Sequence, residues 1–368
     1  MGILGGTVED LVMSFSEYSG KKVLVTGHTG FKGSWLVTWL NLLGAEVCGY
    51  GMDPGGKSLF RILEPTLHND ERGDLRDIKR LRAAVDEIQP DIVFHLAAQA
   101  LVGESYENPI ETVTTNVVGT ANLLESLRTL PYDCHCVVVT SDKCYLNREW
   151  EYAYRECDHL GGHDVYSASK AAAEIVTAAW SSSFFTDRGG IVTARGGNVI
   201  GGGDFTRGRL FPDCVAALSE NRKIELRNPK SIRPWQHVLD CLSGYLTLGE
   251  WLMSNSFRSS KDRAFNFGPI AESQRSVAEL VGQIFEFWPG QLIDSSDPLA
   301  PHESDRLAVS IDRASSVLGW TPTWHFSDAV RETVQWYRMF YGGGSQTEMH
   351  AETLDQIGRY MKSCSIGV

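Results

Sequence analysis

The residues best suited to chemistry include a tyrosine and a lysine that lie four positions apart, Tyr166 and Lys170. On a helix these side chains project from the same face, one turn apart. An ammonium group at that distance stabilises a phenolate and lowers the tyrosine pKa from about 10, so Tyr166 can serve as a general base for a substrate hydroxyl. The alternative is a pair that merely shares a helix surface. Ser141 favours a catalytic role for Tyr166 and Lys170, because it ends an upstream strand and can hydrogen-bond the same substrate oxygen.

An acid and an amine follow Ser141 directly, as Asp142 and Lys143. Such a pair can perform an elimination, because one group removes a carbon-bound proton while the other protonates a leaving hydroxyl. A simple dehydrogenase has no need of it. The alternative is a solvated Asp-Lys pair at the start of a loop.

A glycine-rich turn near the N-terminus predicts a dinucleotide site. Glycines recur every third residue where a strand at 23–26 turns into a helix, so backbone N–H groups and the helix N-terminus can hold a pyrophosphate. The candidate residues in this turn are Gly27, Thr29, Gly30, Phe31, Lys32 and Gly33. Asp53 follows Gly33 by 20 residues and can accept from the ribose hydroxyls, unless it is only a turn residue before Pro54. Because no arginine follows Asp53 directly, we expect NAD rather than NADP.

Later strand ends add further cofactor candidates. Small or short side chains there let a flat cofactor lie against the backbone, and the candidates are Asp74, Leu75, Leu96, Ala97, Ala98 and Gln99. His95 lies among them, but we expect it to be structural.

Asparagine and arginine residues in the second half suggest recognition of a diphosphate, since a planar guanidinium binds phosphate oxygens bidentately. They follow a strand at 191–194 or lie in loops beyond it: Arg195, Asn198, Arg209, Arg227 and Arg233. For Arg209 and Arg227 a solvated loop position remains open. Trp235 is expected to pack rather than to stack on a base.

The elements that position these residues alternate between strand and helix. Strands are expected at 21–26, 46–50, 91–95, 136–140 and 191–194, with helices at 31–43, 78–88, 109–130 and 166–183. This order predicts a Rossmann-type, doubly wound parallel sheet with ligands at the carboxyl ends of its strands. Further helices are expected at 238–252, 277–287 and 326–340. We divide the chain into an extension (1–20), a dinucleotide-binding domain (21–200), a smaller mixed α/β substrate lobe (201–341), some of which returns to the first domain, and a flexibly linked tail (342–368).

Composition excludes several functional classes. With 368 residues, 42% apolar content and no long apolar run, the chain is neither disordered nor membrane-spanning. A formal charge of −12 argues against nucleic-acid or anionic-membrane partners. Eight scattered cysteines fit reduced thiols in the cytoplasm and predict no metal site. The acidic N-terminus does not resemble an export signal.

Long local strings give a family resemblance from about residue 22 to residue 336. The strings are TGHTGFKGSW, DIVFHLAAQ, TSDKCY with NREW, YS with SK, GNVIGGGD, RNP, SIRPWQHVL, NFGP, PHE and LGW. On them the chain resembles the CDP-glucose 4,6-dehydratase family of the extended short-chain dehydrogenase/reductase superfamily. Val165, Ala168 and Gly196 depart from the proline, asparagine and alanine usual there, and none of these changes removes a reacting group.

The resemblance implies an internal redox cycle on CDP-glucose with tightly held NAD, yielding CDP-4-keto-6-deoxyglucose for deoxysugars of surface polysaccharide such as lipopolysaccharide. It implies that Tyr166 is the base for the 4-hydroxyl, assisted by Lys170 and Ser141, that Asp142 is the acid and that Lys143 is the candidate C5 base. It assigns Asn198 and Arg233 to the diphosphate, and Arg209, Arg227, His302 and Glu303 to the substrate lobe. Relatives also suggest a homodimer or homotetramer.

Three other functions remain open. A nucleotide-sugar 4-epimerase would use Tyr166 and Lys170 without Asp142 and Lys143. A GDP-mannose dehydratase would favour NADP, against which the sequence after Asp53 argues. A non-catalytic NAD-binding scaffold or sensor would not need Tyr166 and Lys170.

Overall fold

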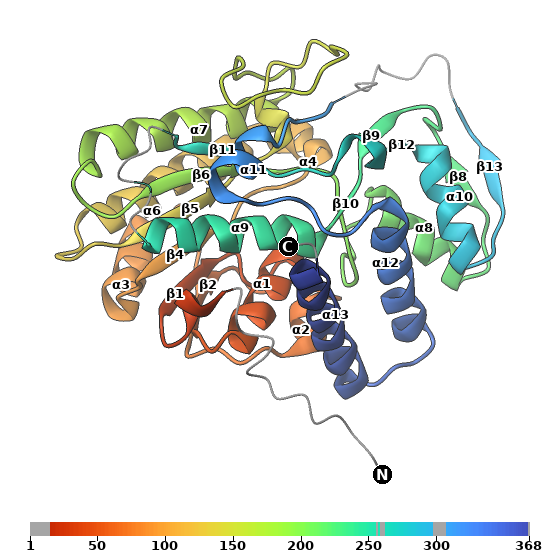
Figure 1. The fold of residues 1–368 in the computed structure, drawn as a ribbon, viewed down its shortest axis with the longest axis horizontal. Helices are drawn as coiled ribbons and strands as arrows, with labels where there is room; N and C mark the ends of the chain where they lie inside the picture. The colour runs from red at the N-terminus through yellow and green to blue at the C-terminus, as the bar shows by residue number, and fades with distance from the viewer. Residues whose placement is uncertain (1–14, 255–256, 258–261, 297–306, 367–368) are drawn as a thin grey trace.

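The computed structural model describes residues 15–254, 257, 262–296 and 307–366, and a seven-stranded parallel sheet forms its centre (Figure 1). In spatial order the strands are β11 (Ala264–Asn266), β6 (Ile191–Arg195), β5 (His135–Val139), β4 (Ile92–His95), β1 (Lys22–Thr26), β2 (Glu46–Gly51) and β3 (Asn69–Arg72). Every neighbouring pair is parallel. The strand order reverses beside β1, which places a ligand crevice at the carboxyl ends of β1 and β4. The predicted Rossmann-type fold is confirmed.

Helices cover both faces of the sheet, which explains why its central strands are almost continuously apolar. One face packs against α1 (Phe31–Leu42) and α9 (Val238–Met253), with α13 (Gln346–Ile366) beside α1. The other face packs against α3 (Ile78–Ile88), α6 (Gly119–Arg128) and α7 (Val165–Phe184). The helix predicted at 109–130 is α5 (Pro109–Val113), a π-helical turn (Thr114–Val118) and α6 in direct succession, preceded by α4 (Val102–Glu107).

A smaller lobe lies beside the sheet, on the right in Figure 1. Its strands form the pairs β7 (Val199–Ile200) with β10 (Gln236–His237), β9 (Ile232–Pro234) with β12 (Gln274–Ser276), and β8 (Ile224–Leu226) with β13 (Leu292–Asp294). Its helices are α8 (Leu210–Ser219), α10 (Val277–Phe287) and α12 (Phe326–Tyr341). The short helices α2 (Leu59–Leu63) and α11 (Asp312–Leu318) complete the fold.

Both ends of the described chain differ from the sequence expectation. Residues 346–366, expected to be a flexibly linked tail, form α13, whose Tyr360 hydroxyl donates to the buried Asp240 at 2.8 Å. At the other end, Phe15 and Tyr18 belong to the hydrophobic core, and the Tyr18 hydroxyl donates to the carbonyl of Leu246 at 2.7 Å. These parts of the predicted extension and tail therefore support the fold.

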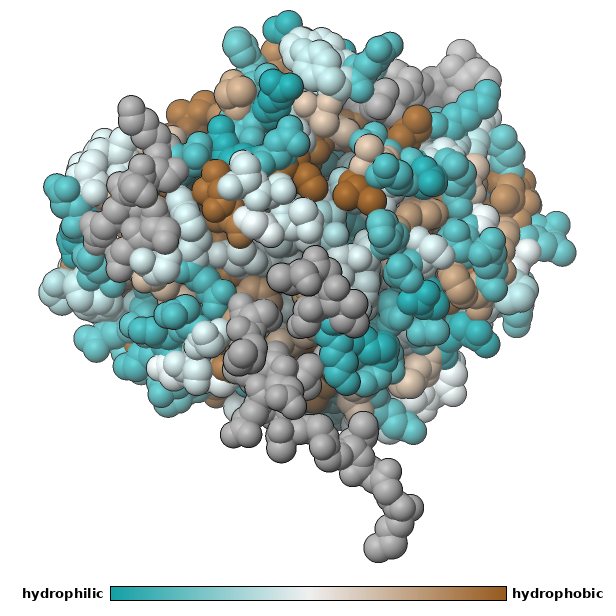
Figure 2. All heavy atoms as spheres, in the orientation of Figure 1, coloured by the Kyte–Doolittle hydropathy of each residue, from teal (hydrophilic) through white to brown (hydrophobic). Residues whose placement is uncertain are grey.

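Hydrophobic residues on the face drawn in Figure 2 occur in small groups among hydrophilic ones. Among the described residues, no helix combines the length and apolar content needed to span a membrane. All eight cysteines lie in the described part of the chain and are free thiols.

Candidate active site

The predicted catalytic residues meet where β5 ends and α7 begins. A short 3-10 turn (Asp142–Cys144) follows β5, and Ser141 caps it by accepting the Lys143 N–H at 3.2 Å. The Ser141 hydroxyl donates to Asp142 Oδ1 at 3.0 Å. Tyr166 lies in the first turn of α7 and is close enough for hydrogen bonding to Ser141 to affect its pKa. The structure thus brings Ser141, Asp142 and Tyr166 together, as the sequence predicted.

Burial controls the electrostatics of the tyrosine and lysine. Burial raises the pKa of Tyr166 to about 12, although hydrogen bonding to Ser141 and the charge of Arg209 act in the opposite direction. The expectation that its pKa falls below 10 is therefore wrong for this structure. Burial, reinforced by the nearby charge of Lys32, lowers the pKa of Lys170 to about 8, while Glu174 opposes the shift. Lys170 still carries its proton at neutral pH.

Asp142 is enclosed by the backbone that follows β6. Its side chain is buried, and a Cβ atom placed on Gly197 would lie only 2.1 Å from its carboxylate. Asn198 Nδ2 lies 3.5 Å from Asp142 Oδ2, and the Asn198 backbone is left-handed, with φ of 49°. Lys143 is half-buried beside Asp142. The acid is thus held rigidly at the junction of β5 and β6, and the amine follows it.

The glycine-rich turn has the shape that a dinucleotide phosphate requires. A Cβ atom on Gly27 would lie 2.7 Å from Ala97 N, and one on Gly33 would lie 2.2 Å from Gly27 O, so only glycine allows these backbones to meet. Gly27 also has a left-handed φ of 72°. Gly30 is the N-cap of α1 and has no side chain to cap the helix, so the N–H groups of the first turn make no capping hydrogen bond and can serve a ligand. These features fit a bound pyrophosphate.

Residues around that turn differ in how they are placed. Thr29 donates to Met52 O at 2.9 Å and so ties the turn to the end of β2. Lys32 instead points into the protein, with its Nζ 3.4 Å from Tyr245 Oη and 3.7 Å from Cys241 Sγ. Phe31 lies beside Gly201, where a Cβ atom would be 3.1 Å from its ring.

Asp53 lies at the end of β2 with its side chain 83% exposed, and an arginine that the sequence argument overlooked lies near it. Arg72 Nε, at the end of β3, is 3.7 Å from Asp53 Oδ1. The same guanidinium makes a shorter ion pair with Asp70, at 2.6 Å. Only the sheet register brings Arg72 to Asp53, because the two residues are 19 positions apart.

The later strand ends also face the crevice edge. Asp74 forms a bidentate pair with Arg76, which lowers the Asp74 pKa, and Leu75 is buried against Gly119. Leu96 and Ala97 bond back to Thr26, and Ala98 is half-buried. Gln99 is clamped by Asn116, whose amide accepts from Gln99 N at 2.8 Å and donates to Gln99 O at 3.0 Å.

His95 is structural, as expected. It is buried, and its ring nitrogens lie 2.7 Å from Thr26 Oγ1 and 3.1 Å from Thr120 Oγ1. Burial, reinforced by the charge of Lys170, lowers its pKa to about 3. Neutral at physiological pH, His95 ties β4 to β1 and α6.

The expected substrate-lobe residues have different surroundings. Arg209 pairs with the buried Asp204 at 2.8 Å and is near enough to Tyr166 to influence its pKa. Arg227 is exposed at the end of β8, and Arg233 is half-buried in β9 and donates to Ile232 O. His302 and Glu303 lie outside the described residues. Trp235 is buried and donates to Arg275 O, which confirms a packing role.

Arg195 is not a loop arginine available to a diphosphate. It ends β6 with 4% of its side chain exposed and pairs with Glu174 at 2.7 Å. Glu174 follows Lys170 by one helical turn and also accepts from Thr140, the residue before Ser141. We missed this pair from the sequence, although the four-residue spacing of Lys170 and Glu174 is a signal that could have found Glu174.

Comparisons with known proteins agree with this geometry. The family model described as GDP-mannose 4,6 dehydratase matches residues 24–333. A CDP-glucose 4,6-dehydratase from Salmonella typhimurium is 43% identical over 337 residues, covering 89% of this chain and 93% of that protein. The chain belongs to this dehydratase family. The resemblance noted in the sequence is thereby confirmed.

Solved structures of similar proteins share the fold. A UDP-glucose 4-epimerase from Thermus thermophilus in complex with NAD is 26% identical and superposes with a TM-score of 0.71, covering 86% of this chain and 98% of that one. An epimerase from Methanothermobacter thermautotrophicus is 25% identical with a TM-score of 0.76, covering 90% of this chain and 96% of that one. Dehydratases and epimerases thus share one scaffold, and the site residues must distinguish them.

Proposed function

We propose that the protein is an NAD-dependent CDP-glucose 4,6-dehydratase, which converts CDP-glucose to CDP-4-keto-6-deoxyglucose and water. The observation that carries the proposal is the placement of Asp142 beside Ser141 and Asn198, on the turn that also bears Lys143. Tyr166 and Lys170 serve an epimerase equally well, but an acid and an amine at this strand end suit elimination. The 43% identity to a CDP-glucose 4,6-dehydratase supports the choice of substrate.

The cofactor is proposed to be NAD, held by the turn between β1 and α1. Gly27 to Gly33 would hold the pyrophosphate, Asp53 the adenosine ribose, Asp74 and Leu75 the adenine end, and the stretch Leu96 to Gln99 the cofactor's underside. Arg72 already pairs with Asp70, so a ribose 2′-phosphate next to Asp53 would be repelled by that carboxylate and would have to compete with Asp70 for the guanidinium. When bound, the nicotinamide ring supplies an acceptor for hydrogen from C4 of the sugar and a donor for C6.

Oxidation at C4 needs a base for the 4-hydroxyl proton. Tyr166 would take this proton, with Ser141 hydrogen-bonded to the same oxygen. Because burial holds the Tyr166 pKa at about 12 in spite of the hydrogen bond with Ser141, the positive charge of Lys170 must favour the phenolate when the proton moves. The C4–H and O–H bonds break, and a C4=O bond forms.

Elimination then becomes possible because the 4-keto group acidifies the neighbouring C5–H. Lys143 would remove the C5 proton and Asp142 would protonate the 6-hydroxyl, so the C6–O bond breaks and water leaves. Hydrogen is then returned to C6 and a proton to C5, which yields the 4-keto-6-deoxy sugar with no net redox change. The product would serve deoxysugars of surface polysaccharides.

One experiment separates this function from its rivals. The purified protein is incubated in D2O with CDP-glucose, dTDP-glucose, UDP-glucose and GDP-mannose in parallel, and products are followed by proton NMR. A 4-keto-6-deoxy product from CDP-glucose alone, with deuterium at C5, is expected. A sugar inverted at C4 would make the protein an epimerase. Every substrate returned unchanged while NAD stays bound would favour a scaffold or sensor.

We also propose that the protein is a homo-oligomer in the cytoplasm. Apolar side chains are exposed on α4, α5, the π turn and α7, at Tyr106, Ile110, Val113, Val118 and Ile175. Several exposed apolar residues on neighbouring helices are typical of an interface. The free cysteines fit a reducing compartment.

Sedimentation velocity tests the oligomer. Ile175→Asp is expected to yield monomers, whereas Leu292→Asp, on the exposed strand β13, is the matched control and is expected to leave the assembly intact. Unchanged assembly in Ile175→Asp would contradict this interface.

A further inference from the structure

A chain of buried polar side chains runs behind the proposed catalytic residues. It starts at Glu174 on α7, one turn after Lys170, and crosses to Arg195 at the end of β6 through a 2.7 Å ion pair. Arg195 Nη1 donates to the hydroxyl of Tyr145 at 2.8 Å, and that hydroxyl donates to Asn266 Oδ1 on β11 at 2.7 Å. These four side chains are buried. Glu174 also accepts from Thr140 Oγ1, so the chain touches the strand end that carries Ser141.

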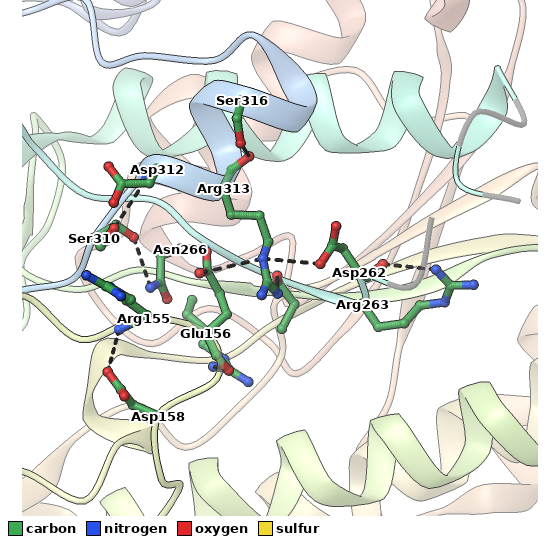
Figure 3. A network of polar contacts seen from close by, with 12 residues as sticks. Arg155, Glu156, Asp158, Asp262, Arg263, Asn266, Ser310, Asp312, Arg313 and Ser316 are labelled. Carbon is green, nitrogen blue, oxygen red and sulfur yellow. Dashed lines mark hydrogen bonds and ion pairs between the residues drawn. The ribbon is translucent and has the colours of Figure 1, made fainter. Parts of the chain in front are cut away.

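A second set of contacts fixes the loop that follows Tyr145. Between Tyr145 and Asp164 the backbone forms no helix or strand, only isolated bridges. Glu156 in this loop accepts from Asn266 N at 2.9 Å, and its carbonyl accepts from Arg195 at 3.1 Å. Figure 3 shows Arg313 reaching from α11 towards Glu156 and Asp262, at 3.7 and 3.3 Å. Side-chain contacts therefore add to the few backbone bridges that hold this segment.

Tyr145 is the point where these contacts reach the proposed elimination pair. It lies two residues after Lys143, and its ring stacks on Tyr154 at 5.3 Å. By contrast, Tyr166 and Lys170 are fixed by the regular hydrogen bonds of α7. Tyr145 ends the turn that bears Asp142 and Lys143, so its hydroxyl anchors that turn from one side, whereas Tyr166 and Lys170 lie on a different element.

We propose that Tyr145, held by Arg195 and Asn266, is a positioning residue that sets the elimination pair Asp142 and Lys143 against the sugar without taking part in C4 oxidation. The inference rests on the proposed dehydratase function. A buried ion pair such as Glu174 with Arg195 adds little net stability, because desolvation offsets its attraction. A fully satisfied buried polar network is suited to fixing one segment of the chain against another, here the loop after Tyr145 against β6 and β11.

The test compares Tyr145→Phe with wild-type protein and with the matched variant Tyr154→Phe. Both changes delete one hydroxyl from the same aromatic stack, but within the described part of the chain the Tyr154 hydroxyl hydrogen-bonds to Asn147 and Arg148 of the loop itself. Reactions with CDP-glucose in D2O are acid-quenched, and mass spectrometry measures the oxidised 4-keto-glucose intermediate, the dehydrated product and deuterium at C5. The ratio of elimination to oxidation is internal to each active molecule, so partial unfolding does not alter it.

In Tyr145→Phe we expect elimination to slow by about 10- to 100-fold relative to oxidation, because small misplacements of reacting groups have effects of that size. The 4-keto-glucose intermediate should accumulate, while Tyr154→Phe keeps the wild-type ratio. Thermal unfolding measured alongside should show the bulk of both variants folded. If Tyr145→Phe fails to fold, Arg195→Lys replaces it, since lysine keeps a positive charge beside Glu174 but lacks the guanidinium that also donates to the Tyr145 hydroxyl, and the same direction is expected.

An unchanged ratio in the folded Tyr145 variant would overturn the inference, and so would an equal fall in the ratio for Tyr154→Phe. Equal loss of both steps also overturns it, since that result denotes a purely structural role. Failure of the proposed function is a separate result, because wild-type protein would then give neither the intermediate nor the product.

Discussion

Substituting alanine for Gly197 should disable the proposed acid while leaving the cofactor site intact. A Cβ atom on Gly197 would lie 2.1 Å from Asp142 Cγ and Oδ2 and 2.2 Å from Oδ1. Since ordinary contacts lie at about 3.5 Å, the carboxylate must retreat by more than about 1 Å. It is 3% exposed and enclosed by its neighbours, so it cannot rotate freely into solvent. Gly197 has no positive φ, so the alanine backbone itself is not strained.

A displacement of that size is expected to slow elimination by about 100-fold. Formation of the 4-keto-6-deoxy product, the 4-keto-glucose intermediate and NAD affinity would be measured together. The matched control is Gly196→Ala at the next position, where the added Cβ atom meets Phe267 O at 3.1 Å and Cys241 Sγ at 3.3 Å. These contacts relax with small shifts, so the control should retain activity. Full activity in Gly197→Ala would refute the reasoning, as would a loss explained by weakened NAD binding.

Three further predictions concern charge. The catalytic rate should fall as pH rises above about 8, because Lys170 has a pKa of about 8 and loses its charge there. Lys32→Met removes a like charge near Lys170 and should move this fall in the pH-rate profile to higher pH. An unchanged profile in Lys32→Met would contradict the assignment of the fall to Lys170. Burial raises the pKa of Asp240 from 3.8 to about 6, so folding binds a proton between those values and stability falls as pH rises through them. Above pH 6, the free energy of unfolding of Asp240→Asn should therefore exceed that of wild type by up to about 3 kcal/mol, as measured by denaturant unfolding. Near pH 4 this difference should disappear. A difference that stays constant with pH would contradict this. Asp53→Asn should lower the ratio of the NADP to the NAD dissociation constant by about tenfold, because it removes the carboxylate that repels a 2′-phosphate beside Arg72, although Asp70 still pairs with Arg72. Arg72→Met in the same background should reverse the gain.

Elements with strong periodicity could be predicted from the sequence to within a residue or two. The strands β1, β4, β5 and β6 are short runs rich in β-branched residues, and α3 and α10 have their expected bounds of 78–88 and 277–287. Helix α13 was missed because three glycines precede it and its buried face mixes Met349, Ile357 and Tyr360 with the polar Thr353 and Gln356. A mixed face of this kind lacks the apolar stripe that marks an amphipathic helix.

The site shows a similar division. Residues at strand ends, such as Gly27 and Ser141, follow from local order, since the carboxyl ends of parallel strands share one edge. Contacts between distant segments do not, so Arg195 was mistaken for a loop arginine and Arg72 was overlooked beside Asp53. The predicted direction of the Tyr166 pKa shift was also wrong, because burial is a property of the whole fold and outweighed the hydrogen bond with Ser141.

In the proposed reaction, hydrogen removed from C4 returns to C6 of the same sugar. This transfer is tested most directly with CDP-glucose carrying deuterium at C4, incubated with the protein in ordinary water, with the product analysed by NMR and mass spectrometry. We expect a 4-keto-6-deoxy product with the label in its C6 methyl group. Label found back at C4, in a sugar that keeps its 6-hydroxyl, would contradict it.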